Sequence, residues 1–200
     1  MTNFPFPGLN LAITTPFDDA GRIDYGRLEV NIERYLAAGV RSFLLSSGTG
    51  MHVYLSKAES EELVRRGAKI VNGRAKVIAQ TSALLVEDVV ERTARARDAG
   101  AEGVMVLPPF FEGPTDDEGI VDFYAEVAKS GLPVIGYNVP QAVGRRHHAG
   151  ASRQAQRNPG LFSRQGQQRG FGKPSGPHPH RPFRHERRRS ARSLCALCRM

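Results

Sequence analysis

The chain has 200 residues, of which 40% are hydrophobic and 24% charged, with 28 Lys and Arg against 20 Asp and Glu and a formal net charge of +8. This composition suits a globular domain with a sizeable core. No stretch approaches the roughly 18–20 apolar residues of a membrane-spanning helix, and the start, MTNFPFPG, lacks the pattern of a signal peptide. We therefore expect a cytoplasmic protein that does not enter a membrane.

The positive charge is confined to one part of the sequence. Residues 1–143 carry 14 Lys and Arg against 19 Asp and Glu, a net charge of −5, whereas residues 144–200 carry 14 against 1, a net charge of +13. After Gly144 there is no Val, Ile, Thr, Tyr or Asp, but five of the six His and both Cys lie there. Such a segment buries too little apolar surface to offset its ordering entropy, so we expect residues 144–200 to be disordered.

Residues 1–143 alternate short apolar runs with longer stretches of helical periodicity. In chain order, the sequence predicts strands and helices in turn: a strand at 9–15, a helix at 24–38, a strand at 42–46, a helix at 57–71, a strand at 76–81, a helix at 86–99, a strand at 103–107, a helix at 117–129 and a strand at 133–137. Asp24 is placed to cap the first helix, Ser56 and Glu59 form a capping-box sequence before the second, and a glycine follows each helix.

The predicted strands are apolar nearly throughout, which is typical of a parallel sheet covered by helices. A repeat of about thirty residues for each strand and helix fits either a doubly wound sheet or the opening of a (β/α)8 barrel. The periodicity does not choose between these two α/β folds.

Three motifs stand at the ends of predicted strands. The sequence SSGTGMHVYLS (46–56) follows the second strand and forms a glycine-rich turn, which either binds an anion through backbone N–H groups or only connects the strand to the helix. The second motif, VMVLPPFFEGPTDDEG (104–119), stands at the end of the fourth strand. The third, PVIGYNVPQAVG (133–144), puts Tyr137 at the carboxyl end of the fifth. Barrels carry their catalytic residues at that end, although a single Tyr there is more often a packed residue.

Taken together and in order, the motifs AITTPFDDAGRID, GTG before LSKAE, GVMVLPPFF and YNVP resemble the dihydrodipicolinate synthase / N-acetylneuraminate lyase family over residues 9–144. The resemblance implies that residues 1–143 form part of a TIM (β/α)8 barrel with about five strands and four helices. It implies a class I aldolase or lyase, in which pyruvate or another 2-keto acid forms a Schiff base with a lysine and the protonated imine stabilises a carbanion. It implies a homo-oligomer, and neither a cofactor nor a metal.

The resemblance also implies roles for individual residues. Gly48, Thr49 and Gly50 match the turn that binds the carboxylate of the keto acid. Tyr137 matches the catalytic tyrosine that relays protons, and Thr49 is the hydrogen-bonded neighbour that such a phenol requires. His52 is a weaker candidate for a polar contact, and a structural histidine is the favoured alternative.

Three features differ from dihydrodipicolinate synthase itself, and they involve five positions. The turn has Gly48 and Met51 in place of a Thr and a Glu, and the paired aromatics Phe110 and Phe111 lack the hydroxyl of a relay tyrosine. Ala142 stands where an Arg would bind the carboxylate of the second substrate, and Ala makes no such bidentate contact. We therefore expect a different reaction, on a 2-keto-3-deoxy sugar acid or another aldol.

The Schiff-base lysine of the family lies on the sixth strand, and the sequence predicts no such strand, so we expect the family sequence to break off at Gly144. The nearest lysine, Lys173, lies among Pro and Gly residues that disfavour a central strand. Read one nucleotide later, the codons for Arg164–Phe171 permit Val-Lys-Asp-Ser-Ser-Gly-Asp, which resembles the lysine strand. In the same shifted frame, the codons for residues 145–150 permit Val-Asp-Ile-Thr-Pro-Ala. Those for residues 153–160 permit Ala-Lys-Leu-Ser-Glu-Ile-Pro-Gly. We therefore expect an out-of-frame translation after Gly144, without a catalytic lysine and without activity.

Two alternatives for residues 144–200 remain open. Their arginines suit phosphate contacts in a basic nucleic-acid-binding protein, although three Phe are the only aromatic residues there. A zinc site is the other alternative, and its ligands would come from Cys195, Cys198, His178, His180 and His185. One Cys-x-x-Cys pair with irregular histidine spacing is a weak signal, so we favour free thiols and no metal.

Overall fold

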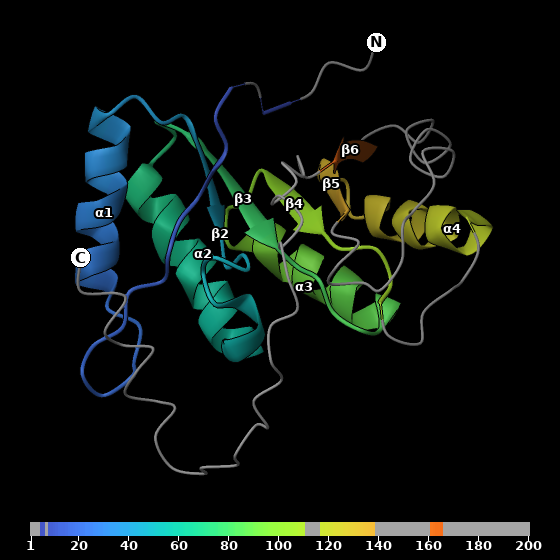
Figure 1. Ribbon diagram of the computed structural model, residues 1–200, viewed down its shortest axis with the longest axis horizontal. Helices are drawn as coiled ribbons and strands as arrows, with labels where there is room; N and C mark the ends of the chain where they lie inside the picture. Colours follow the sequence, from blue (N-terminus) through green and yellow to red (C-terminus); the bar gives the residue numbers. More distant parts are fainter. Residues whose placement is uncertain (1–4, 7, 111–116, 139–160, 166–200) are drawn as a thin grey trace, which may run out of the picture. The chain divides into compact units, whose positions relative to one another are not determined.

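The computed structural model describes residues 5–6, 8–110, 117–138 and 161–165, which form a parallel sheet with helices (Figure 1). The strands are β1 (Leu11–Ala12), β2 (Ser42–Leu45), β3 (Lys76–Gln80), β4 (Gly103–Val106), β5 (Val134–Asn138) and β6 (Leu161–Gln165). The helices are α1 (Tyr25–Ala37), the 3₁₀ helix η1 (His52–Tyr54), α2 (Lys57–Val71), α3 (Val86–Asp98) and α4 (Asp117–Ala128). Each strand pairs in parallel with the next one along the chain.

This βα repeat confirms the prediction of part of a (β/α)8 barrel with four helices at the expected places. Asp24 caps α1 by accepting a hydrogen bond from the backbone N–H of Arg27. Ser56 and Glu59 form the predicted capping box of α2, in which each side chain bonds the backbone N–H of the other residue. The first strand is shorter than the predicted range 9–15, because β1 pairs with β2 through two residues only.

The structure has one strand more than the five that the sequence predicts. β6 pairs with β5 from Val134 opposite Leu161 to Asn138 opposite Gln165. The expectation of an irregular segment after Gly144 is therefore wrong for Leu161–Gln165. The sequence LFSRQ lacks the β-branched residues that usually signal a strand, but the ladder is made by backbone N–H and C=O groups, and the edge of β5 offers these to any extended segment.

The two faces of the sheet have separate cores, because successive residues of a strand point to opposite faces. On the helix-covered face, Phe43 and Leu45 of β2 and Val77 of β3 pack with residues such as Leu63 of α2 and Val89 of α3. The other face, which is the interior in a barrel, carries a smaller cluster. Its buried members are Phe6, Leu44, Ile78, Met105 and Ile135.

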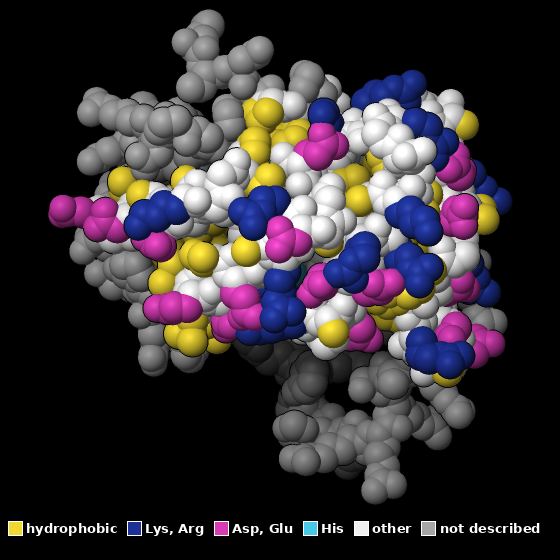
Figure 2. Space-filling view, turned by 180° about the vertical axis from the view of Figure 1, so that it is seen from behind, with side chains coloured by type: hydrophobic (Ala, Val, Ile, Leu, Met, Phe, Trp, Pro, Cys, Tyr) yellow, Lys and Arg dark blue, Asp and Glu magenta, His cyan; other side chains and the backbone are white. Residues whose placement is uncertain are grey.

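Charged side chains of both signs are interleaved on the surface (Figure 2). In α2, Arg65 pairs with Glu61 and Glu62, and Arg66 pairs with Glu62. Exposed pairs of this kind contribute about 0–1 kcal/mol each, whereas a fully buried Val, Leu or Phe contributes about 1.5–3 kcal/mol. Apolar burial therefore provides most of the stability. Among the described helices, none combines the length and apolar character needed to cross a membrane.

Candidate active site

A cavity of about 250 Å³ opens on the face of the sheet that the helices do not cover. Its apolar walls come from β1 to β5 and consist of Ala12, Leu44, Ile78, Met105 and Ile135. Its polar lining consists of Asn10, Ser47, Gly48, Thr49 and Tyr137. An apolar cavity with a few convergent polar groups is the usual form of a small-molecule site.

The turn after β2 begins with a residue in an uncommon conformation. Ser46 has a φ angle of +51°, in the left-handed region that few residues other than glycine adopt. It interrupts the alternation of the strand, so that Leu45 and Ser46 both lie on the helix-covered side. Ser47 returns to the other face and lines the cavity together with Leu44.

Hydrogen bonds and close packing hold this turn in place. The N–H of Met51 donates to the carbonyl of Gly48 at 3.2 Å, and Oγ1 of Thr15 donates to the carbonyl of Gly50 at 2.7 Å. A Cβ atom at Gly50 would lie 3.1 Å from the carbonyl oxygen of Ile13, whereas the space around Gly48 is open. Gly50 therefore packs closely against the backbone of Ile13 and Ser47, and Gly48 lines the cavity.

Two polar atoms at the cavity have no partner in the described part of the chain. They are Oγ of Ser47 and Oδ1 of Asn10, and both are buried. Leaving such an atom unpaired costs about 1–3 kcal/mol, so both favour a polar ligand or water in the cavity. Neither residue is predicted as a site residue from the sequence. Ser47 belongs to the SSGTG motif, but only the positive φ of Ser46 decides which of the two serines turns inward.

Tyr137 reaches the cavity from β5, where its ring packs against the inner cluster. Tyr124 of α4 lies in the helix-side core instead. Its hydroxyl donates to the carbonyl of Val106 at 3.1 Å, and burial raises the pKa of this phenol. Of these two tyrosines, only Tyr137 is placed to act on a ligand in the cavity.

The structure brings Gly48, Thr49 and Tyr137 to one cavity, with no hydrogen bond between the Thr49 and Tyr137 hydroxyls among the described contacts. His52 lies elsewhere: it is 7% exposed, and its Nε2 is 2.9 Å from the carbonyl oxygen of Ser82. That contact joins η1 to the loop after β3, which is a structural role. Other positions named from the sequence lie outside the described residues: Phe111, Ala142, Lys173, His178, His180, His185, Cys195 and Cys198.

No lysine lines the cavity within the described part of the chain. Lys57, Lys76 and Lys129 form ion pairs with carboxylates at the surface. The described residues also contain no group of three or more His, Cys, Asp or Glu that could hold a metal ion. Among the described residues, the cavity is therefore lined by a glycine-rich turn, hydroxyl groups and a phenol, but by no amine.

Known proteins are similar to this chain in sequence and in fold. The model of the Dihydrodipicolinate synthetase family matches residues 5–148. The 4-hydroxy-tetrahydrodipicolinate synthase of Methanoculleus marisnigri is 32% identical over 142 residues, which are 70% of this chain and 48% of that protein. The enzyme of the same name from Bacillus subtilis is 35% identical over 135 residues, 68% of this chain and 47% of that protein.

Among solved structures, the chloride-inhibited dihydrodipicolinate synthase of Acinetobacter baumannii complexed with pyruvate has a TM-score of 0.74 at 28% identity. The match covers 78% of this chain and 54% of that one. The chain spans about half the length of the curated relatives it matches.

Replacing Gly50 by Ala should destabilise the protein, whereas the same replacement at Gly48 should not. At position 50 the new Cβ would meet the carbonyl oxygen of Ile13 at 3.1 Å and the nitrogen of Ser47 at 3.2 Å. We expect the free energy of unfolding to fall by about 1–3 kcal/mol for Gly50→Ala and to change by less than about 0.5 kcal/mol for Gly48→Ala. Urea unfolding followed by circular dichroism measures both, and equal effects of the two substitutions would contradict the packing described for Gly50.

The pKa of His52 should make stability depend on pH. Burial lowers this pKa below its ordinary value of 6.5, since the charged ring is disfavoured inside the protein. The stability due to neutral His52 is therefore fully present above pH 6.5 and is lost as the pH falls through the lower pKa of the folded state. The melting temperature should fall more steeply below pH 6.5 in the unsubstituted chain than in His52→Gln, whose neutral amide does not titrate. Parallel profiles of the two proteins would show that His52 does not contribute.

Proposed function

Because this chain belongs to the dihydrodipicolinate synthetase family, we propose that its gene derives from a Schiff-base-forming aldolase or lyase acting on pyruvate or on a 2-keto-3-deoxy sugar acid. The cavity that Gly48, Thr49 and Tyr137 line together carries this proposal. It combines an anion-binding turn, a phenol and apolar walls in a space that suits a small 2-keto acid.

The turn after β2 binds the carboxylate of the keto acid. Its N–H groups at Met51 and His52 bond carbonyl oxygens within the turn, whereas those of Gly48 and Thr49 have no partner among the described residues. Free adjacent N–H groups form an anion-binding concavity. The unpaired hydroxyl of Ser47 adds a third donor at the same place.

Tyr137 moves the proton that the reaction requires. When the keto carbonyl condenses with an amine, water leaves, and the resulting iminium ion accepts the electron pair of the bond that breaks beside it. The phenol of Tyr137 then takes up or returns a proton at the oxygen of the aldehyde that departs or adds. A phenol that relays protons needs a polar neighbour for this step, and the hydroxyls of Ser47 and Thr49 lie at the same cavity.

We propose that the chain as it stands has little or no activity, because residues 144–200 are read in the wrong frame and lack the nucleophilic lysine. In the β5–β6 ladder, Tyr137 lies opposite Arg164, and Asn138 lies opposite Gln165. In the shifted frame the codons from Arg164 onward permit Val-Lys-Asp. That reading would place a lysine at the end of β6, on the strand beside Tyr137.

The whole protein is proposed to be a cytoplasmic homo-oligomer. Val53 and Tyr54 of η1 are 80% and 74% exposed, and Leu84 and Leu85 after β3 are 61% and 62% exposed. The hydrogen bond between η1 and the loop after β3 joins the two segments that carry these side chains. Clustered exposed apolar residues mark interaction surfaces, so this region supports association between copies of the chain.

Sequencing the gene tests the reading-frame proposal directly. We expect an insertion or deletion of a single base close to the codon for Gly144. Its correction should open a frame that encodes Val-Lys-Asp-Ser-Ser-Gly-Asp from the codon for Arg164 onward. If no single-base correction opens such a frame, residues 144–200 are genuine, and the proposal of an out-of-frame segment is wrong.

Borohydride trapping with pyruvate tests the Schiff-base chemistry. Reduction converts an imine into a stable adduct that mass spectrometry detects, so we expect no adduct on the 200-residue chain and one lysine adduct on the frame-corrected protein. In the corrected protein, Tyr137→Phe should lower turnover by about 10²–10⁴-fold, as expected for loss of a proton-transfer group. The Tyr124→Phe control, from the helix-side core, should keep its turnover.

The two proteins separate the two parts of the proposal. An adduct on the 200-residue chain would refute the claim that its nucleophile is missing. A frame-corrected protein that folds but forms no adduct would refute the Schiff-base function itself.

A further inference from the structure

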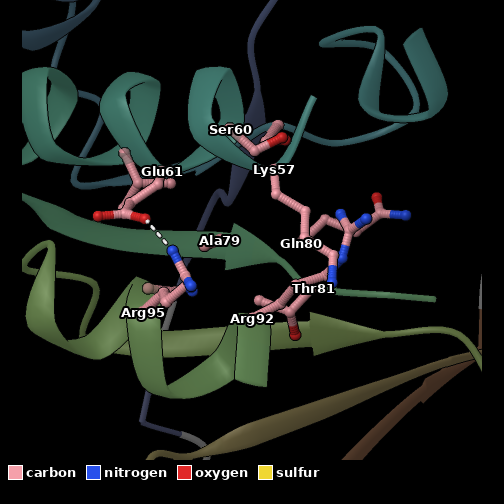
Figure 3. A pocket seen from close by; sticks show the side chains of 11 residues that line it. Lys57, Ser60, Glu61, Ala79, Gln80, Thr81, Arg92 and Arg95 are labelled. Atoms are coloured by element: carbon pink, nitrogen blue, oxygen red, sulfur yellow. Dashed lines mark hydrogen bonds and ion pairs between the residues drawn. The ribbon is translucent and has the colours of Figure 1, made fainter. Parts of the chain in front are cut away.

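A second, smaller pocket lies on the opposite face of the sheet from the candidate active site. It is bounded by α2, α3 and the carboxyl ends of β2 and β3 (Figure 3). Val64, Ala79 and Ala96, which form its apolar floor, belong to the helix-side core. Its volume is about 30 Å³. Since one water needs roughly 10–15 Å³ by this measure, the pocket holds two or three waters or one small ion.

Arg92 of α3 is the unusual residue of this pocket. Its Nε is buried and has no hydrogen-bond partner in the described part of the chain. No carboxylate lies within ion-pair distance of its guanidinium there. The pKa of the nearby Asp88 carboxyl is lowered mainly by its hydrogen bond with Lys57, and the charge of Arg92 adds a smaller effect. The Nε–H group has been removed from water without gaining a hydrogen-bond acceptor in the protein. This is costly unless a ligand accepts its hydrogen bond.

The other cations at the pocket are already paired. Lys57 contacts Asp88 at 2.5 Å and Glu91 at 3.1 Å. Arg95 contacts Glu91 at 2.9 Å and Glu61 at 3.2 Å, and the latter contact is drawn in Figure 3. Arg92 is therefore the cation of this group whose donors are left for a ligand. Glu61 also lines the pocket, and its charge is balanced by Arg95 and by Arg65.

Hydroxyl groups complete the polar lining. Oγ of Ser46 donates to Oγ of Ser60 at 3.1 Å, which leaves the Ser60 hydroxyl hydrogen free to donate into the pocket. Gln80 lines the same pocket, and its amide nitrogen donates to Oγ of Ser82 at 3.5 Å. A guanidinium with a neighbouring hydroxyl donor is the arrangement that binds phosphate or carboxylate oxygens.

We propose that this outer pocket binds a small oxyanion, a phosphate or a carboxylate, through the guanidinium of Arg92 and the hydroxyl of Ser60. The volume limits the ligand to one tetrahedral or planar group, or to the end of a larger molecule that extends into solvent. The sheet separates this pocket from the cavity at Tyr137, so the proposal does not depend on the Schiff-base function.

Thermal unfolding of the 200-residue chain in the presence of inorganic phosphate or acetate tests the proposal. A ligand that binds the folded state raises the melting temperature, and sodium chloride at equal ionic strength controls for screening. We expect phosphate, acetate or both to stabilise the unsubstituted chain beyond chloride. Arg92→Gln should weaken the apparent affinity by about tenfold or more, which corresponds to about 1.4 kcal/mol.

The matched control is Arg97→Gln, which removes the same charge from the same helix. Arg97 pairs with Asp98 and lies outside the pocket, so the affinity of Arg97→Gln for the anion should equal that of the unsubstituted chain. Ser60→Ala provides a second test if Arg92→Gln does not fold, and it should weaken binding severalfold. No stabilisation of the unsubstituted chain beyond chloride would overturn the proposal. So would equal affinities of Arg92→Gln and Arg97→Gln, which would place the anion elsewhere, including in the inner cavity.

Discussion

The left-handed backbone of Ser46 determines where both pockets lie. In a regular strand, residues 44 and 46 would point to the same face of the sheet. A φ of +51° breaks this rule, so that Ser46 lies beside Ser60 on the helix side and Ser47 faces the inner cavity. A non-glycine residue in this region costs roughly 1–2 kcal/mol. The hydrogen bonds of the turn and of the Ser46 hydroxyl offset that cost, and a β-branched residue would meet a larger one.

The inner face of the sheet is occupied at one end and open at the other. Phe6 is 2% exposed, and its ring fills the space in front of Gly103, the first residue of β4. A Cβ atom at Gly103 would lie 2.3 Å from this ring, so the glycine is needed for the ring to approach. Phe6 therefore packs against the amino end of β4. The carboxyl ends are left to the turn and to Tyr137, which is the usual division between stability and chemistry in a barrel.

Much of the fold follows from local sequence signals, because each strand and helix is marked by its own period and caps. The Ser56–Glu59 box and Asp24 place the starts of two helices, and the buried apolar strands indicate a parallel sheet. β6 could not be predicted in this way, since its pairing depends on the free edge of β5 and not on its own residues.

The candidate site was recognised only in part, for a similar physical reason. Thr49 and Tyr137 stand at strand ends, where residue type and position already suggest chemistry. The inward orientation of Ser47 depends on the positive φ of Ser46, which no residue pattern indicates. Recognising Arg92 as a candidate binding residue requires knowing that the acids around it are paired with other cations. In the sequence VVERTARARD, this arginine looks like any other charged residue on a solvated helix face. Such residues emerge only when contacts between distant segments are known.

The parallel pairing of β5 and β6 explains why a break in reading frame between them would remove the activity and spare the site. The turn proposed to hold the carboxylate follows β2, and the tyrosine proposed to move the proton lies in β5, so both precede Gly144 in the sequence. The backbone of the next strand, which would carry the nucleophile, lies about 4.8 Å from β5, the usual spacing of neighbouring strands. In this chain the backbone of β6 occupies that place with the sequence LFSRQ. Strand pairing depends on the backbone and survives a change of frame over a few residues, whereas an imine requires one amine at one position. On the proposed reading, the groups for binding and proton transfer are therefore kept in a chain that lacks the amine for the covalent intermediate.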